Sequence, residues 1–358
     1  MAALSRIGIV GAAGFIGNRA VEVMHLGGGY EVVPVVRRPS ALALPGRFDL
    51  QPAIADAFDS PALARAFAGC ELVLVAVAGD PATIVGTIPH IYRAADRAGV
   101  RRLIYLSSAS VHGQAPAPGT DERVPLPRSQ PLAYNRAKAL AERRLLALRS
   151  AGRTEVVILR PGIVHGPRSQ WTGGLADQLL AGQAFLADRG SGVCNSAYVD
   201  NVVHAISLAG DAEGVDGEAF LIGDAETVSW RAFVAPIAAA LGRDVDHLPT
   251  PSSSAILKRR PPASTWLVPP LRSAYRMLPR QLAAPVRIAV RLARESRPHA
   301  TVPPAEAFSR ELALLHSCQV RLPHTKAESR LGYRPVVTFD EACRRSVAWL
   351  GFAGYPVQ

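Results

Sequence analysis

The fold is decided by the stretch "RIGIVGAAGFIGNRA", residues Arg6 to Ala20. An apolar run is followed at once by three glycines, Gly11, Gly14 and Gly17, and then by a helical pattern. Glycine loses more backbone freedom on folding than any other residue, so this spacing indicates a backbone that closely approaches a ligand. We expect a tight strand-to-helix turn whose helix N-terminus binds a pyrophosphate.

Further apolar, strand-like runs alternate with helical patterns through the first half of the chain. They are "YEVVPVV" (30–36), "ELVLVAVAG" (71–79), "RRLIYLSS" (101–108) and "TEVVILRPG" (154–162). Continuous Val/Ile/Leu runs are typical of strands buried on both faces, and helices between them indicate parallel crossovers. The sequence therefore predicts an α/β fold, a Rossmann doubly wound parallel sheet.

After Gly166 the pattern changes to helical stretches interrupted by Pro and Gly. One unit, "NSAYVDNVVHAISLA" (195–209) followed by "GEAFLIGD" (217–224), looks like a further helix and strand of the sheet. We predict a dinucleotide-binding domain over 1–168, joined by 196–224, and a smaller, mostly helical substrate lobe over 225–358 with 169–195. Ligands of such folds bind at the carboxyl edge of the sheet.

The net charge of +11 is concentrated in one insertion, residues 255–298. Its arginines in "LRSAYRMLPRQLAAPVRIAVRLARES" recur at helical spacing with apolar residues between them. Basic amphipathic helices often lie on anionic bilayers, so the insertion predicts peripheral contact with the inner face of a membrane beside the substrate entrance. The alternative is an arginine-rich solvated surface, and a nucleic-acid partner is not expected.

The sequence carries no charged leader before its first strand and no apolar run of roughly 20 residues, so a cytoplasmic location is expected. Cys70, Cys194, Cys318 and Cys343 are far apart and form no CxxC pair. We therefore expect reduced thiols and no metal site.

Cofactor preference is indicated by the residues that follow the second strand. An acid about 20 positions after the glycines would bind a ribose 2′-hydroxyl, but this place holds Arg37 and Arg38. A guanidinium can bind a 2′-phosphate through paired hydrogen bonds. The expected cofactor is NADP(H) rather than NAD(H); two solvated arginines are the alternative.

Chemistry is indicated by "YLSSASVHG", which ends a strand with three serines, and by "YNRAK", where Tyr134 and Lys138 lie four apart. Residues four apart share one helix face, so the ammonium can lie beside the phenol. An adjacent cation stabilises a phenolate, which predicts that Lys138 lowers the pKa of Tyr134 toward the range useful for acid/base catalysis.

Taken together, these motifs resemble the extended short-chain dehydrogenase/reductase family along nearly the whole chain. The likeness includes "GAAGFIG", "LSSASVHG", "YNRAK", "RPGIVHGP" (160–167), "YVDNVVHA" (198–205) and "KAESRLGYRPVVTFDEACRRSVAWL" (326–350). The resemblance implies that Tyr134 is the acid/base, that Lys138 holds the nicotinamide ribose and that Ser108, rather than Ser107 or Ser110, hydrogen-bonds the reacting oxygen. It also implies a homodimer.

Further cofactor contacts follow from the same resemblance. They are Phe15 and Ile16 in the glycine turn, Asp56 near the adenine, Val77 and Ala78 where the strand-like run 71–79 passes the cofactor, and Pro161 and Gly162 beside the nicotinamide.

The substrate is suggested by a departure from the family pattern. Nucleotide-sugar epimerases and dehydratases tend to carry an arginine where this chain has Cys194, and a thiol cannot replace that charge. The basic insertion resembles the 3β-hydroxysteroid and sterol dehydrogenase branch. We expect an NADP(H)-preferring oxidoreductase acting on a secondary alcohol or ketone of an apolar, sterol- or terpenoid-like small molecule. The alternatives are a nucleotide-sugar epimerase or dehydratase with tightly bound cofactor, and a non-catalytic NADP(H)-binding sensor.

Overall fold

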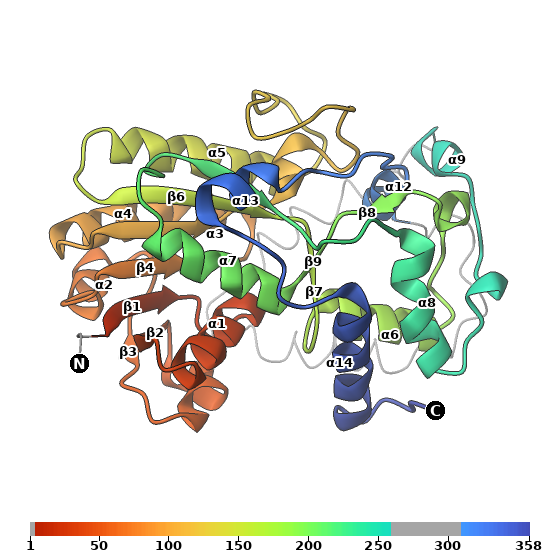
Figure 1. Cartoon of the computed structure of the whole chain (residues 1–358), viewed down its shortest axis with the longest axis horizontal. Coiled ribbons are helices and arrows are strands. Elements are labelled where there is room, and N and C mark those ends of the chain that lie inside the picture. The colour runs from red at the N-terminus through yellow and green to blue at the C-terminus, as the bar shows by residue number, and fades with distance from the viewer. Residues whose placement is uncertain (1–3, 259–308) are drawn as a thin grey trace, which may run out of the picture.

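A computed structural model describes residues 4–258 and 309–358 (Figure 1). Most of the basic insertion predicted at 255–298, and with it the membrane contact expected there, lies outside the described residues. Only its first residues are described, in α9 (Ser253–Lys258).

The central sheet has seven strands, all parallel, in the order β10-β6-β5-β4-β1-β2-β3. The strands are β1 (Ser5–Val10), β2 (Tyr30–Val36), β3 (Ala53–Ile54), β4 (Leu72–Val75), β5 (Arg102–Leu106), β6 (Glu155–Pro161) and β10 (Ala219–Ile222). The order reverses direction after β3, at β4, as a doubly wound sheet requires. The predicted Rossmann fold is confirmed.

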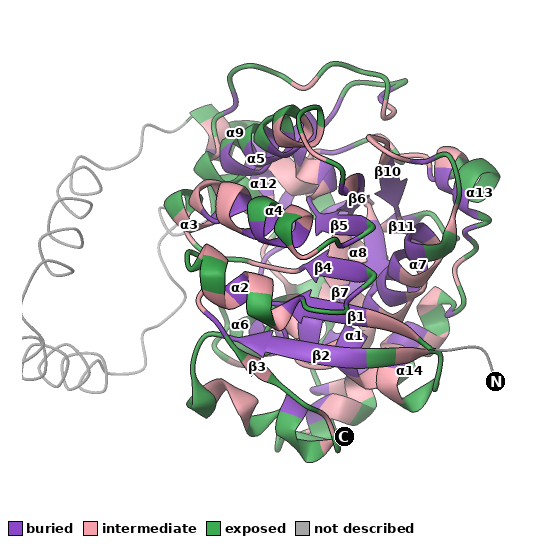
Figure 2. Ribbon diagram, turned by 90° about the vertical axis from the view of Figure 1, so that its left-hand side faces the viewer, coloured by how far each residue is buried: buried purple, intermediate pink, exposed green. Residues whose placement is uncertain are grey.

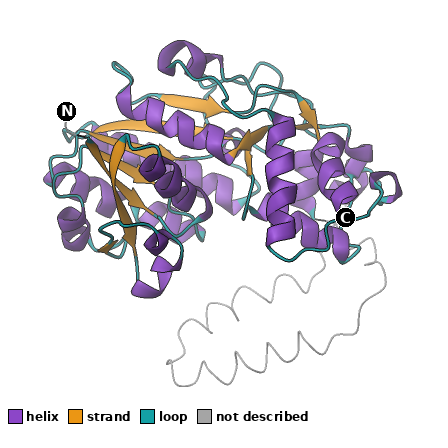
Figure 3. Cartoon of the chain, turned by 60° about the horizontal axis from the view of Figure 1, so that its bottom comes forward, coloured by secondary structure: helices purple, strands orange, loops and turns teal. Residues whose placement is uncertain are grey.

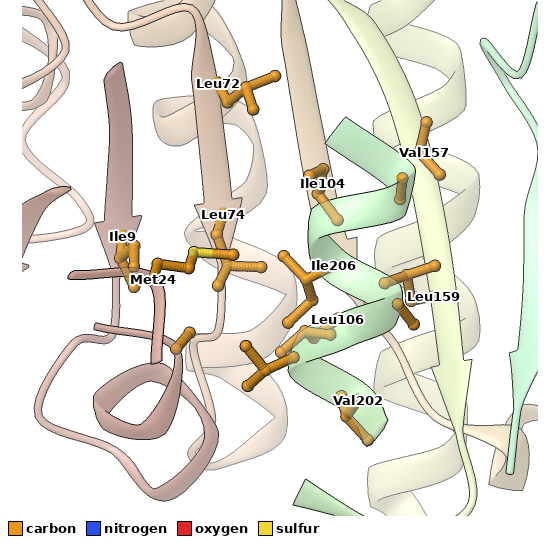
Figure 4. Close-up of a cluster of buried hydrophobic side chains, with 14 of the residues drawn as sticks. Ile9, Met24, Leu72, Leu74, Ile104, Leu106, Val157, Leu159, Val202 and Ile206 are labelled. Atoms are coloured by element: carbon orange, nitrogen blue, oxygen red, sulfur yellow. The ribbon is translucent and has the colours of Figure 1, made fainter. Parts of the chain in front are cut away.

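Helices cover both faces of this sheet, which explains why its strands, apart from edge strand β3 and the first residues of β1 and β2, are largely buried (Figure 2). One face is covered by α1 (Phe15–Leu26) and α7 (Val199–Asp211), and Figure 4 shows Met24 and Ile206 packed against Leu74 and Ile104. The other face is covered by α2 (Ser60–Ala66), α3 (Pro81–Gly86), α4 (Ile88–Arg97) and α5 (Ala133–Arg149).

A second group of elements lies beyond the carboxyl edge of the sheet and is mostly helical (Figure 3). Its core contains Trp230, Phe233 and Leu350. Its helices are α6 (Leu175–Leu180), α8 (Trp230–Ala240), α9, α12 (Arg310–His316) and α14 (Phe339–Phe352); α13 (Thr325–Leu331) packs instead on the α7 face of the sheet. Within the described ranges, no helix is both long and apolar enough to cross a membrane.

Two short sheets join the two parts. β7 (Ile163–His165) pairs with β9 (Ser196–Tyr198) in parallel, and β8 (Val193–Cys194) pairs with β11 (Val228–Ser229) antiparallel. Of the segment 196–224, therefore, β10 enters the central sheet while β9 does not. The remaining turns are η1 (Pro39–Ala43), η2 (Pro45–Arg47), η3 (Ala109–His112), η4 (Gln170–Gly174), η5 (Ala187–Gly190) and η6 (Val245–His247).

Candidate active site

The glycine turn leaves room for a ligand beside the first residues of α1. Gly11 has φ +90°, and a Cβ there would lie 2.7 Å from the Ala76 carbonyl oxygen. A Cβ at Gly17 would collide with the Gly11 carbonyl, whereas one at Gly14 would meet only that carbonyl, at 3.2 Å. No side chain caps α1 and its first turn holds no acid. Backbone N–H groups at the start of α1, with no capping side chain and no acid beside them, fit a pyrophosphate.

Arg37, Arg38 and Asp56 lie at the same edge of the sheet as this turn. β2 ends at Val36, and Val36 pairs with Ile54 of β3, so the residues that follow both strands are neighbours. Both arginines are exposed. Asp56 is half-buried and accepts a hydrogen bond from the Phe58 N–H at 2.9 Å. The edge can therefore present two guanidinium groups to an anion.

A cavity of about 650 Å³ opens between the sheet edge and the helical part, and we call it the catalytic cavity. The structure brings together around it these residues predicted from the sequence: Phe15, Ile16, Ala78, Ser108, Tyr134, Pro161 and Gly162. Arg37, Arg38, Asp56 and Val77 do not line it, and Lys138 lies buried beneath it.

The serines at the end of β5 point in different directions. Ser107 donates a short hydrogen bond to Glu142 and so faces the interior. Ser108 faces Ser110, with 2.9 Å between their hydroxyl oxygens, and also hydrogen-bonds Tyr134. Ser108 and Tyr134 can therefore act on the same substrate atom.

Tyr134 is 40% exposed and stands at the first turn of α5. Its burial against the cavity wall raises the pKa of the phenol, and the hydrogen bond with Ser108 opposes this rise. The direction differs from the lowering expected from Lys138 in the sequence. A raised pKa keeps the phenol protonated near neutrality, so that it can donate a proton.

The position of the Lys138 ammonium explains why the pKa of Tyr134 is not lowered as expected. Its Nζ donates to the Leu106 carbonyl oxygen at 2.7 Å and lies 6.0 Å from the centre of the Tyr134 ring. Burial lowers the pKa of Lys138 to about 8, while Glu142 acts in the opposite direction. The ammonium is directed to the end of β5 rather than to the phenol oxygen.

A buried ion pair lies behind these residues. Glu142 accepts from Arg160 Nη2 at 2.7 Å and from Arg160 Nε at 3.1 Å, with side-chain exposures of 2% and 7%. Arg160 also contacts His112 Nε2 at 3.2 Å. Burial and the Arg160 charge lower the pKa of His112 to about 4. The pair joins α5 to β6 and thereby fixes Tyr134 relative to Pro161 and Gly162.

A second cavity of about 260 Å³, the apolar chamber, adjoins the catalytic cavity and shares Trp171, Trp230 and Leu315 with it. Its other walls include Leu175, Phe185, Phe233, Val234 and Leu312. His316 also lines the chamber, and its ring centre lies 4.6 Å from a ring centre of Trp230, with the two rings tilted by 43°.

We expect acid to destabilise the protein through His316. Its Nδ1 accepts a hydrogen bond from the Ala187 N–H at 3.0 Å, and burial lowers its pKa to about 4. The unfolded chain binds this proton at higher pH than the folded chain, so stability falls from about pH 6.5 downward and the loss of about 3 kcal/mol is complete below about pH 4.

Urea unfolding of wild type and His316→Gln between pH 4 and 7 measures this effect. The variant should have a shallower dependence of stability on pH, whereas His247→Gln, at a histidine whose side chain is 86% exposed, should keep the wild-type dependence. Equal slopes for wild type and His316→Gln would contradict a neutral His316.

Cys194 lies on β8 and is buried among the apolar residues around Trp230. Burial raises the pKa of its thiol. Among the described residues, no lysine or arginine lines either the catalytic cavity or the apolar chamber.

The profile of the NAD dependent epimerase/dehydratase family matches residues 7–223. The chain belongs to this family. Among its relatives, a 3 beta-hydroxysteroid dehydrogenase/Delta 5-->4-isomerase of Mycobacterium tuberculosis is 29% identical over 67% of this chain and 70% of its own. A 3beta-hydroxysteroid-dehydrogenase/decarboxylase of Arabidopsis thaliana is 28% identical over 82% of this chain and 65% of its own. The predicted resemblance to the extended short-chain and 3β-hydroxysteroid dehydrogenases is confirmed.

Solved structures of this family share the fold. A dTDP-glucose 4,6-dehydratase from Streptomyces venezuelae, solved with NAD, superposes with a TM-score of 0.68 at 20% identity over 97% of both chains. The Bordetella bronchiseptica enzyme WbmG, in complex with NAD, gives 0.66 at 20% identity over 99% of this chain and 96% of its own. The glycine turn described above is the part of this fold that fits a dinucleotide.

Sequence reasoning missed the partners that hold this site. Glu142 stands one helical turn after Lys138, so the same spacing that singled out Tyr134 and Lys138 could have found it. Gln114 and Glu311 also line the catalytic cavity. Glu311 comes from a distant part of the chain, and no local pattern points to it.

Proposed function

We propose that this family member is an NADP(H)-preferring oxidoreductase that interconverts a secondary alcohol and a ketone on an apolar, sterol- or terpenoid-like molecule. The proposal is carried by one arrangement: Ser108 and Tyr134 face a shared cavity, and that cavity continues into a chamber walled by Trp171, Trp230 and other apolar side chains.

In the direction of reduction, each residue of the site would have a separate role. When bound, the nicotinamide supplies the hydride. Tyr134, protonated because its pKa is raised, gives its proton to the substrate oxygen, and Ser108 donates a hydrogen bond that stabilises the developing negative charge. Lys138 donates to Leu106 and leaves two further N–H groups for the nicotinamide ribose. Phe15, Ile16, Ala78, Pro161 and Gly162 would contact the cofactor.

Lipid-like substrates are favoured by the walls of the two cavities. Burial of apolar surface stabilises binding by about 25 cal/mol per Å² of area removed from water. A sugar diphosphate would need cations, and the described lining residues supply none. Cys194, where epimerases tend to have arginine, is buried and carries no positive charge.

Native mass spectrometry of the purified protein tests this function. A retained NADPH or a co-purifying lipid, followed by turnover of that lipid class measured at 340 nm, would support the proposal. A permanently bound NAD with turnover of a nucleotide sugar would support the epimerase alternative. Binding of NADPH without turnover of either class would favour a sensor.

We expect NADPH to bind more tightly than NADH because Arg37 and Arg38 are exposed beside the glycine turn. In Arg37→Ala the 2′-phosphate loses a charged hydrogen-bond partner, which should cost about 1.5 to 3 kcal/mol of NADPH affinity and leave NADH affinity unchanged. Calorimetric titration measures both constants.

Arg97→Ala, at an exposed arginine in the last turn of α4, is the control and should change neither affinity. Equal binding of NADH and NADPH by wild type would refute the assignment of the two arginines.

A further inference from the structure

Glu311 brings a carboxylate to the junction of the two cavities. It stands in the first turn of α12 and lines both the catalytic cavity and the apolar chamber. Among the described residues that line the two cavities, four have ionisable side chains: Tyr134, Glu311, His316 and Cys318. The lowered pKa of His316 keeps it neutral. Glu311 is therefore the one carboxylate among described lining residues that are otherwise apolar or uncharged polar groups, which indicates a specific task.

Glu311 is held in place from the opposite wall. Gln114 Nε2 donates to Glu311 Oε1 at 3.0 Å, and Gln114 Oε1 receives a long contact of 3.5 Å from Asn135 Nδ2. Asn135 is 1% exposed and directly follows Tyr134. The carboxylate is therefore tied to the helix that carries the reactive phenol, and its charge contributes to the raised pKa of Tyr134.

We propose that Glu311 selects substrates by charge, by accepting a hydrogen bond from a hydroxyl or ammonium group of an apolar molecule that spans both cavities and by excluding molecules that carry a carboxylate or phosphate there. This inference rests on the proposed oxidoreductase function. An ionised carboxylate is only an acceptor, so a donor on the substrate can pair with it. Glu311 is exposed where the cavities open to solvent, and a second anion beside it would be repelled by its charge.

This selection would separate the chain from part of its family. A Schizosaccharomyces pombe relative, 26% identical over 73% of this chain, is named a sterol-4-alpha-carboxylate 3-dehydrogenase, decarboxylating. Glu311 predicts that the present chain rejects such carboxylates and accepts the matching neutral or amine-bearing compounds.

A matched pair of ligands tests the proposal: 3-oxo-4-androstene-17β-carboxylate and its methyl ester, titrated in the presence of NADPH. Trp171 and Trp230 line both cavities, so tryptophan fluorescence reports binding. Wild type should bind the ester at least about tenfold more tightly than the acid. E311Q should remove the difference and E311K should reverse it. E213K, at an exposed glutamate after α7, is the control and should behave as wild type.

Equal binding of acid and ester by wild type, or an unchanged ratio in E311K, would overturn the inference. A second measurement needs no steroid: the titration of Tyr134, followed by NMR of ¹³Cζ-tyrosine and assigned with Y134F, should move to lower pH in E311Q. If wild type binds neither steroid but this shift occurs, the apolar substrate class fails while the carboxylate opposite Tyr134 stands. If the shift is absent, Glu311 does not act at the site.

Discussion

Replacing Tyr134 with phenylalanine will lower turnover by about 10²- to 10⁴-fold, the usual contribution of a positioned proton donor, and will leave NADPH affinity close to wild type. The ring remains against the cavity wall, and only the transferable proton and the hydrogen bond with Ser108 are lost. Steady-state rates at 340 nm, with any alcohol or ketone that wild type accepts, give kcat, and calorimetry gives the NADPH affinity.

Tyr105→Phe is the matched control. Tyr105 lies on β5 with its ring 4.9 Å from Lys138 Nζ, and its hydroxyl has no hydrogen-bond partner among the described residues. Removing that hydroxyl should leave turnover near wild type. Retained turnover in Tyr134→Phe would remove Tyr134 from the mechanism and would strengthen the sensor alternative.

Breaking the Glu142–Arg160 ion pair will lower the free energy of unfolding more than any other change predicted here. In Glu142→Ala, the guanidinium of Arg160 stays buried without its carboxylate, and such changes cost about 3 to 5 kcal/mol. Ser107 loses its acceptor as well. Urea unfolding measures the free energy, and circular dichroism shows whether the variant is folded before the titration begins.

Two further variants separate charge burial from loss of packing. Glu142→Leu combined with Arg160→Met removes both charges and should recover much of the stability lost in Glu142→Ala. Asp121→Asn, which breaks the exposed pair with Arg123, should leave stability near wild type. A double variant no more stable than Glu142→Ala would show that the ion pair itself is required.

Local sequence patterns were sufficient to predict the fold and the glycine turn of the site. The turn at Gly11 and Gly17 depends on backbone space within a few residues, and β2 occupies the predicted run 30–36. β3 and β11 were not predicted because each has two residues, too few to show a period, and each forms only by pairing with a partner elsewhere in the chain. β7, which has three residues, was not predicted for the same reason.

The electrostatics of the site could not be predicted from spacing. The four-residue interval between Tyr134 and Lys138 placed them on one helix face, but the pKa of the phenol depends on burial and on Glu311, which tertiary packing brings to the cavity. Lys138 Nζ is directed away from the phenol oxygen by the Leu106 carbonyl. These contacts join segments that are distant in sequence, so no window of the sequence contains them.

The two cavities share part of their walls, but each also has walls of its own from different parts of the chain. The residues proposed for proton transfer, Ser108 and Tyr134, stand at the end of β5 and at the start of α5, whereas the apolar chamber is built largely from α8 and α12 together with Trp171. Saturation libraries confined to Val234 and Leu312, which line the apolar chamber and not the catalytic cavity, can therefore reshape the accepted molecules while the reacting groups keep their geometry. In such an architecture, substrate range can evolve while the reaction stays the same.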